Sequence, residues 1–130
     1  MKRKIILFVL LVLFLSGCVA DFETELKDLV KKSNENFPVM VSEETRLDYA
    51  VASGHNLHYF YTYPYHTKTM LDLEMTKLSV HQYALQALHE TPEAAYLGEN
   101  NVTIIYHYRD KSGEDLFEFA ILPEEYFSSN

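Results

Sequence analysis

The spacing of apolar residues changes along the chain, and each change predicts a different element. Residues 19–36 are consistent with a short tether followed by a helix, because Phe22, Leu26, Leu29 and Val30 recur at helical spacing among charged residues. From residue 45 to residue 63 the period becomes two, around the turn-forming residues 53–56, which predicts a β-hairpin. In its first strand, we expect Leu47, Tyr49 and Val51 to share the buried face.

Helical spacing returns over residues 68–90, with apolar stripes on two sides, which predicts a helix sandwiched between the sheet and another element. Thr91 and Pro92 then predict the start of a short helical turn that Gly98 closes. Residues 102–121 alternate again around a turn at 110–113, which predicts a second hairpin. We expect the acidic tail from Pro123 to Asn130 to fray.

The order helix, hairpin, helix, hairpin predicts an α+β domain. The expected architecture is a four-stranded antiparallel sheet packed by helices on one face. Residues 56–63 can also be aligned with residues 101–108, which places Tyr61 and Tyr106 at equivalent positions of the two hairpins.

The stretch "NLHYFYTYPYH", residues 56–66, is rich in aromatic residues and histidines. Tyr59, Tyr61 and Tyr63 alternate in phase with Leu57, so we expect them on the face that meets the helices. A tyrosine ring can line a thin core while its hydroxyl reaches water, so the pattern favours a core wall over a ligand-stacking platform.

The opposite face of the sheet is expected to be polar with an apolar centre, which is how a modest protein-binding patch is composed. An ordinary solvated sheet face fits the same pattern. If the domain binds a protein segment, this patch or the neighbouring sheet edge is the expected site, and the groove between the long helix and the sheet is the alternative. The candidate partner-binding residues are His58, Phe60, Thr62, Ile105 and His107.

Signals for catalysis or metal binding are weak. None of the 6 histidines falls in a recognised metal-binding spacing, and only 4 glycines are present, with no phosphate-binding loop. No serine lies in a nucleophile elbow. We therefore expect no catalytic residue, no metal site and no cofactor, and the protein is not expected to be an enzyme.

The first residues predict export. Three basic residues, Lys2, Arg3 and Lys4, precede an apolar run at 5–15 that is too short to cross a bilayer, which is typical of a secretory signal. The sequence Leu15-Ser16-Gly17-Cys18 resembles the lipobox of bacterial lipoproteins. The resemblance implies a signal peptide at 1–17, cleavage before Cys18, and lipid attachment to the sulfur and new amino terminus of Cys18. The alternative is an ordinary cleaved signal in which the cysteine is incidental.

Cys18 is the only cysteine, so one molecule cannot form a disulfide. Residues 18–130 form a predicted single domain whose 8 basic and 19 acidic residues give a net charge of −11. Such an acidic chain argues against a nucleic-acid partner, which requires a basic surface. The expected partners are the lipid bilayer, through acylated Cys18, and a protein of the cell envelope.

Two segments, "FPVMVSEETRLDYA" at 37–50 and "NVTIIYHYRDKSG" at 101–113, together with the lipobox, resemble small proteobacterial lipoproteins. The order of elements is similar to that of the pilotins of type II secretion, lipoproteins that bind a segment of the secretin and escort it to the outer membrane. The resemblance implies a membrane-anchored, non-catalytic binding protein or assembly accessory. Val19 after the cysteine favours the outer membrane, facing the periplasm, in a host with two membranes.

Two other functions fit the sequence. An immunity or inhibitor lipoprotein would use its negative charge to neutralise a basic toxin or enzyme. An enzyme or small-ligand binder is the third class, with the fewest residues in its favour.

Overall fold

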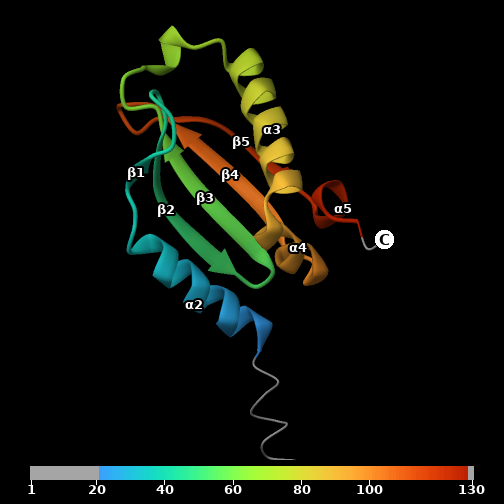
Figure 1. Ribbon diagram of the computed structural model, residues 1–130. Helices are drawn as coiled ribbons and strands as arrows, with labels where there is room; N and C mark the ends of the chain where they lie inside the picture. Colours follow the sequence, from blue (N-terminus) through green and yellow to red (C-terminus); the bar gives the residue numbers. More distant parts are fainter. Residues whose placement is uncertain (1–20, 129–130) are drawn as a thin grey trace, which may run out of the picture.

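The computed structural model describes residues 21–128 (Figure 1). The predicted signal peptide and Cys18 lie outside the described residues. In chain order the elements are α2 (Phe22–Asn34), β1 (Val39–Met40), β2 (Arg46–Ser53), β3 (Asn56–Thr62), the 3-10 turn η1 (Lys68–Met70), α3 (Leu73–Glu90), α4 (Pro92–Glu99), β4 (Thr103–Arg109), β5 (Asp115–Ile121) and α5 (Pro123–Tyr126).

The sheet has five strands in the order β1-β2-β3-β4-β5, and the pair β3–β4 is parallel while the other pairs are antiparallel. The α+β class is confirmed, but the expected four-stranded antiparallel sheet is wrong. The 18 residues of α3 cover about 27 Å at 1.5 Å per residue. The seven residues of β3 cover about 23 Å. The connection therefore returns the chain to the end where β3 began, and β4 runs in the same direction as β3.

The fifth strand, β1, has only two residues, which pair with Leu47 and Arg46 of β2. A segment this short shows no periodicity, so the sequence pattern could not predict it.

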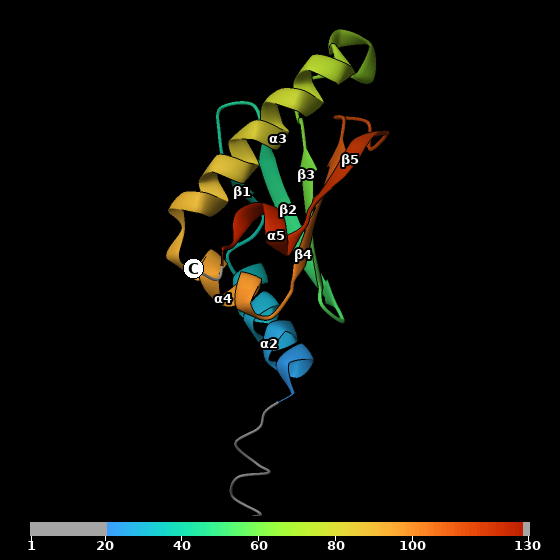
Figure 2. The ribbon, with the colours of Figure 1, turned by 90° about the vertical axis from the view of Figure 1, so that its right-hand side faces the viewer.

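The described helices lie on one face of the sheet, which leaves the other face open to solvent (Figure 2). Helix α2 packs Leu26 and Val30 into the core with Ala50 and Leu57 of the sheet. The Asn34 side chain fastens its end: Nδ2 donates to the Ala50 carbonyl at 2.9 Å, and Oδ1 accepts from the Ala50 N–H at 2.8 Å.

The start of α2 is attached to the turn between β2 and β3. The Phe22 ring stacks on the imidazole of His55 at a centroid distance of 5.1 Å, and it also contacts Tyr96 of α4 at 5.7 Å. His55 Nδ1 donates to the carbonyl of Asn100 at 2.7 Å. The start of α2, the hairpin turn and the end of α4 thus form one end of the molecule.

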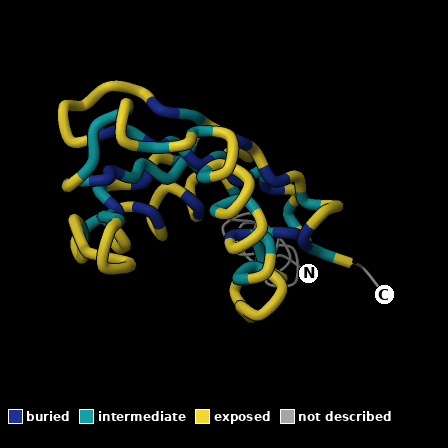
Figure 3. The backbone as a smooth tube through the Cα atoms, turned by 90° about the horizontal axis from the view of Figure 1, so that it is seen from above, coloured by how far each residue is buried: buried dark blue, intermediate teal, exposed yellow. Residues whose placement is uncertain are grey.

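Buried residues lie mostly on the strands (dark blue in Figure 3), and the tyrosines contribute many of them, as the sequence predicted. Tyr63, Tyr106 and Tyr108 are buried, and Tyr59 and Tyr61 pack against the core from its edge. The rings of Tyr61 and Tyr108 stack at 4.8 Å with planes 9° apart. The stripe is the core wall on the helix side of the sheet.

A β-bulge in β2 overturns part of the expected alternation. Leu47 pairs with Tyr61, but the next pair is Tyr49 with Phe60, so Asp48 is an extra residue. Beyond the bulge, Ala50 is buried at 3% exposure, whereas Tyr49 and Val51 are 39% and 41% exposed. The prediction that Tyr49 and Val51 face the core is therefore wrong.

The helix boundaries also differ from expectation. Residues 68–70 form η1, and α3 begins only after Asp72, whose carboxylate accepts from the Met75 N–H at 3.2 Å. Thr91 does precede α4, with Pro92 at its first position, but its hydroxyl donates to the Ala87 carbonyl at 2.6 Å instead of capping α4.

The tail from Pro123 is not frayed at its start. Residues 123–126 form α5, and Tyr126 is 4% exposed. Its hydroxyl donates to the buried Val102 carbonyl at 2.6 Å, and burial raises the pKa of Tyr126 to about 12. The expectation of fraying was based on the acidic composition of the tail, and it was wrong because the buried ring of Tyr126 holds this segment against the core.

Candidate functional site

Two surfaces of the domain are candidates for binding, and they lie on opposite faces of the sheet. The first is the open outer face, where one row of side chains crosses four strands. The register pairs Tyr49 with Phe60, Phe60 with His107, and His107 with Glu118. We call Tyr49, His58, Phe60, His107 and Glu118 the outer-face cluster.

The rings of the outer-face cluster are stacked. Phe60 lies between Tyr49, at a centroid distance of 4.5 Å and 13° between planes, and His107, at 4.4 Å and 5°. Offset or parallel contacts of this kind stabilise an aromatic pair beyond the area that it buries. The stacking holds the imidazole of His107 in one orientation.

A polar chain runs along the edge of this stack. His107 Nδ1 lies 3.1 Å from a Glu118 carboxylate oxygen, and His107 Nε2 lies 2.9 Å from His58 Nδ1. Since the carboxylate accepts from His107 Nδ1–H, Nε2 carries the lone pair and accepts from His58 Nδ1–H. Burial lowers the pKa of His58, the neighbouring His107 lowers it further, and Glu118 acts in the opposite direction.

The structure brings together four of the five predicted patch residues. His58, Phe60 and His107 are in mutual contact, and Ile105 is the register partner of His58 on the same face. Thr62 is different: it is 5% exposed, and its hydroxyl donates to Asp48 at 2.5 Å. The expectation that Thr62 is an accessible part of the patch is wrong, because the bulged Asp48, also bonded to Arg46, covers it.

Two residues of the outer-face cluster were not among the predicted site residues. Glu118 lies in the correct phase of β5, and strand alternation alone could have identified it. Tyr49 could not be found in this way, because the bulge moves it to the outer face.

The second surface is on the helix side of the sheet, where α2 and α3 lie apart from each other (Figure 1) and two mostly apolar cavities are found. One cavity of about 470 Å³ lies between α2, α4 and the sheet, where Leu29, Tyr59 and Tyr96 are among the lining residues. A second cavity of about 600 Å³ lies between α3, the β1–β2 loop and the sheet, where Tyr61, Tyr83 and Val41 are among the lining residues. We call the two together the helix-side groove.

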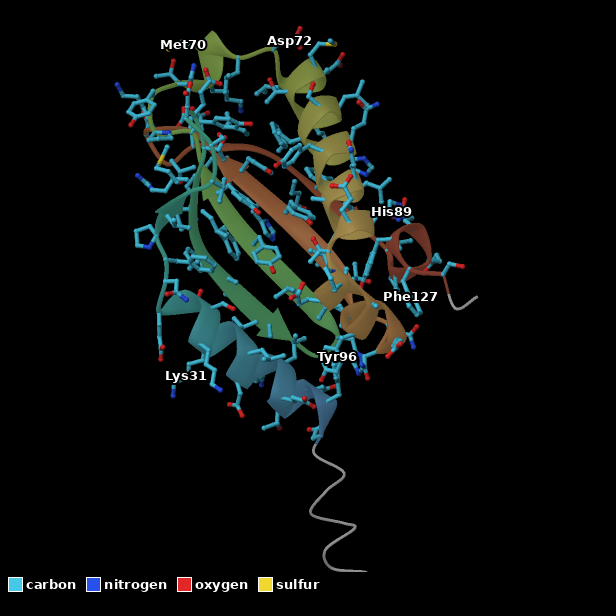
Figure 4. The ribbon with its side chains drawn as sticks, in the orientation of Figure 1. Lys31, Met70, Asp72, His89, Tyr96 and Phe127 are labelled. Carbon is cyan, nitrogen blue, oxygen red and sulfur yellow. The ribbon has the colours of Figure 1, made fainter. Side chains whose placement is uncertain are left out.

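The two cavities adjoin along β3. Tyr59 lines the first and Tyr61 lines the second, and their ring centroids are 6.3 Å apart. Large apolar side chains on both rims remain exposed: Leu29 of α2 at 44% and Tyr83 of α3 at 75%. Figure 4 shows Tyr96 at the α4 end of this region and Met70 at the opposite end of the molecule. Exposed apolar area along a concave surface is typical of a protein-binding groove.

Glu25 and Glu93 line the first cavity, so its mouth is acidic. Burial raises the pKa of Tyr59 and of Tyr61, so both groove tyrosines are neutral hydrogen-bonding groups at neutral pH. The floor can therefore make apolar contacts and neutral hydrogen bonds, while the rim attracts positive charge.

Neither surface resembles a catalytic centre built around a metal. Within residues 21–128, no group of three or more His, Cys, Asp or Glu side chains is placed to hold a metal ion. The helices of that same part of the chain are each too short or too polar to cross a membrane.

These features define a small α+β domain with helices on one face of a mixed sheet and an apolar groove between them. The sequence matches no protein-family model. It also matches no curated protein.

Solved structures do share the fold. The EpsS pilotin of the type 2 secretion system of Vibrio vulnificus superimposes with a TM-score of 0.66 at 7% identity, over 82% of this chain and 93% of EpsS. The type II secretion pilotin AspS of Vibrio cholerae gives a TM-score of 0.62 at 13% identity, over 79% of this chain and 90% of AspS. A Pseudomonas aeruginosa protein thought to be secreted gives a TM-score of 0.69 at 11% identity, over 81% of this chain and 92% of that protein. The chain is thus similar in fold to two pilotins.

Proposed function

We propose that this protein is a lipid-anchored, non-catalytic accessory protein of the cell envelope, similar in role to a pilotin. It binds an apolar segment of an envelope protein in the helix-side groove. The observation that carries the proposal is this groove, in a domain whose fold is that of two type II secretion pilotins. The proposed location is the outer membrane, facing the periplasm.

The groove is favoured over the outer-face patch because of its shape. Its two cavities lie within the range of sizes typical of ligand pockets, and their lining is mostly apolar. On the outer face, by contrast, the rings of Tyr49, Phe60 and His107 already bury area against one another. The outer-face patch of His58, Phe60, Ile105 and His107 remains the competing proposal.

The expected occupant is an amphipathic segment with basic residues beside its apolar face. A helix laid between α2 and α3 would place apolar side chains over Tyr59 and Tyr61. Its basic residues would meet Glu25 and Glu93 at the α2 end.

Capture of the partner from a membrane extract, with the full chain as bait, tests the groove. Leu29→Glu combined with Tyr83→Glu places charges on both rims at exposed positions, so the fold should survive. Capture should fall at least tenfold. The matched control is Leu122→Glu, an exposed apolar position that lines neither cavity.

Phe60→Ser combined with Ile105→Ser tests the competing surface in the same assay, with circular dichroism to verify folding. If this folded variant loses the partner and the groove variant keeps it, the outer face is the binding surface and the groove proposal fails. If the captured protein is a basic toxin or secreted enzyme, the protein is an inhibitor and not a pilotin-like accessory.

A further inference from the structure

The two edges of the sheet are finished differently. At one edge, β1 pairs with Arg46 and Leu47 of β2, and further along the strand the Asn34 side chain bonds to both the N–H and the carbonyl of Ala50. At the other edge β5 is the last strand, and within residues 21–128 no segment other than β4 forms backbone hydrogen bonds with its seven residues. Because an unpaired strand edge is a template for another strand, β5 offers an open pairing site.

Helix α3 places apolar side chains beside this open edge. The His81 ring contacts the ring of Phe119 in β5 at a centroid distance of 5.0 Å, so this side of α3 lies over β5. Figure 2 looks onto the edge, with α3 on one side of β5 and α5 at the end of the strand. Leu78 and Leu85 lie one helical turn before and after His81, so they share its side of α3. The second apolar stripe of α3, which the sequence predicted to be covered, is 53% exposed at Leu78.

The charge of β5 indicates what kind of strand can pair with it. Asp115 and Glu118 are exposed, and 71% of the Glu118 side chain remains accessible beside His107. Two copies of this chain paired along β5 would bring both Glu118 side chains to the same face, and residues 18–130 of each copy carry a net charge of −11. Since like charges on neighbouring strands are destabilising, the edge disfavours a second copy and favours a basic segment.

We propose that the edge of β5 binds an extended, basic segment of a partner protein, which joins the sheet as an added strand. The segment's backbone pairs with β5, its apolar side chains pack beside Leu78 and Leu85, and its basic side chains lie next to Glu118 on the outer face. In strand addition, backbone hydrogen bonds supply affinity and alternate side chains supply specificity. The site is separate from the helix-side groove, because Tyr83, which lines the groove, is two residues from His81 and lies on another side of α3.

Hydrogen exchange of the full chain, followed residue by residue by nuclear magnetic resonance, tests the pairing. The probe is an end-blocked peptide of alternating valine and lysine, equal in length to the seven residues of β5. Every second amide of β5 should exchange freely without the peptide, and a saturating concentration of peptide should slow that exchange at least tenfold. The same peptide with all backbone nitrogens methylated keeps its charges but cannot donate hydrogen bonds, so its affinity should be at least tenfold lower.

Substitutions on two sides of α3 locate the peptide. Leu78→Ser removes the apolar contact beside β5 and should weaken binding about tenfold. Tyr83→Ser is the matched control, an exposed aromatic residue of the same helix on the groove side, and should leave the affinity unchanged. Glu118→Lys should weaken binding of the valine–lysine peptide at least fivefold and favour a valine–glutamate peptide instead.

The two peptides are compared on the unsubstituted chain, so this result does not depend on how the variants fold. Equal affinity for the methylated and unmodified peptides would overturn the proposal, because charge alone would then explain the contact. The proposal also fails if no β5 amide is protected at millimolar peptide, or if Tyr83→Ser weakens binding as much as Leu78→Ser, which would place the peptide in the groove. Protection of β5 amides without peptide, in a chain that sediments as a dimer, would assign the edge to a second copy.

Discussion

Gly98 and Phe127 approach so closely that a β-carbon on Gly98 would lie 2.2 Å from the β-carbon of Phe127. Gly98 is buried within α4, and the contact fixes α5 and Phe127 against that helix. The glycine is needed here for close approach, and not to end the helix as its position suggested.

We expect Gly98→Ala to destabilise the domain by about 1–3 kcal/mol, the usual cost of added volume in a packed site. Thermal unfolding measures the effect. If the cost comes from displacing Phe127, it should largely disappear in a Phe127→Gly background, which removes the β-carbon together with the ring. Glu99→Ala, one residue further along α4 and exposed, should change stability little.

Tyr126→Phe removes the hydroxyl that donates to the Val102 carbonyl and leaves that buried acceptor without its partner. The expected loss is about 1–3 kcal/mol, measured by chemical denaturation. Tyr65→Phe makes the same chemical change at a position that is 64% exposed, and it should have almost no effect. Equal losses in the two variants would mean that the bond to Val102 does not stabilise the fold.

Tyr106→Ala should cost about 3–5 kcal/mol, as large aromatic truncations in cores do. Tyr106 is 6% exposed and contacts Tyr59, Tyr61 and Phe119. Tyr61→Ala should cost less because its ring is only partly buried, and Tyr83→Ala, on the groove rim, less again. A thermal midpoint of Tyr106→Ala within about 2 °C of the unsubstituted protein would contradict this ranking.

Alkaline pH should destabilise the fold. Burial raises the folded-state pKa of Tyr59, Tyr61, Tyr63, Tyr106 and Tyr108 above 10.0, and that of Tyr126 to about 12. Below pH 10 these groups are protonated in both states and contribute no pH dependence. Above it the unfolded chain releases protons that the folded chain keeps, so the free energy of unfolding falls as pH rises. Thermal midpoints and tyrosinate absorbance across this range measure it, and ionisation of every tyrosine near pH 10 in a folded sample would contradict it.

Lipid attachment is the prediction that concerns the start of the chain. Cys18→Ser should abolish labelling by a fatty-acid analogue and leave an unacylated species that is uncleaved or soluble. Equal labelling of Cys18→Ser and the unsubstituted protein would exclude the proposed anchor.

The sequence pattern predicted the class of fold and the tyrosine wall because both depend on the local alternation of apolar residues. It did not predict the parallel pairing of β3 and β4, which depends on how far α3 and α4 carry the chain, or β1, which is too short to have a period. The pattern could not predict the bulge at Asp48 either. Tyr49 and Val51 are as apolar as core residues, so nothing in the alternation shows that they lie on the outer face.

The two candidate sites also differ in how far the sequence predicts them. Strand phase placed His58, Phe60, Ile105 and His107 on one face, which the register confirms, but it could not show that Asp48 covers Thr62. The helix-side groove depends on the spacing between two helices and the sheet, so its lining could not be read from any one segment.

The contact of Phe22 with His55 has a consequence for how the molecule would meet its partner. Only three residues separate Cys18 from Phe22, a reach of about 14 Å between the two Cα atoms. With the proposed lipid anchor at Cys18, the hairpin turn that contacts Phe22 stays close to the bilayer. The domain then diffuses within a thin layer at the membrane surface until it encounters its partner. A membrane-bound partner would then meet the groove at a high effective concentration, so that even a weak contact would be occupied.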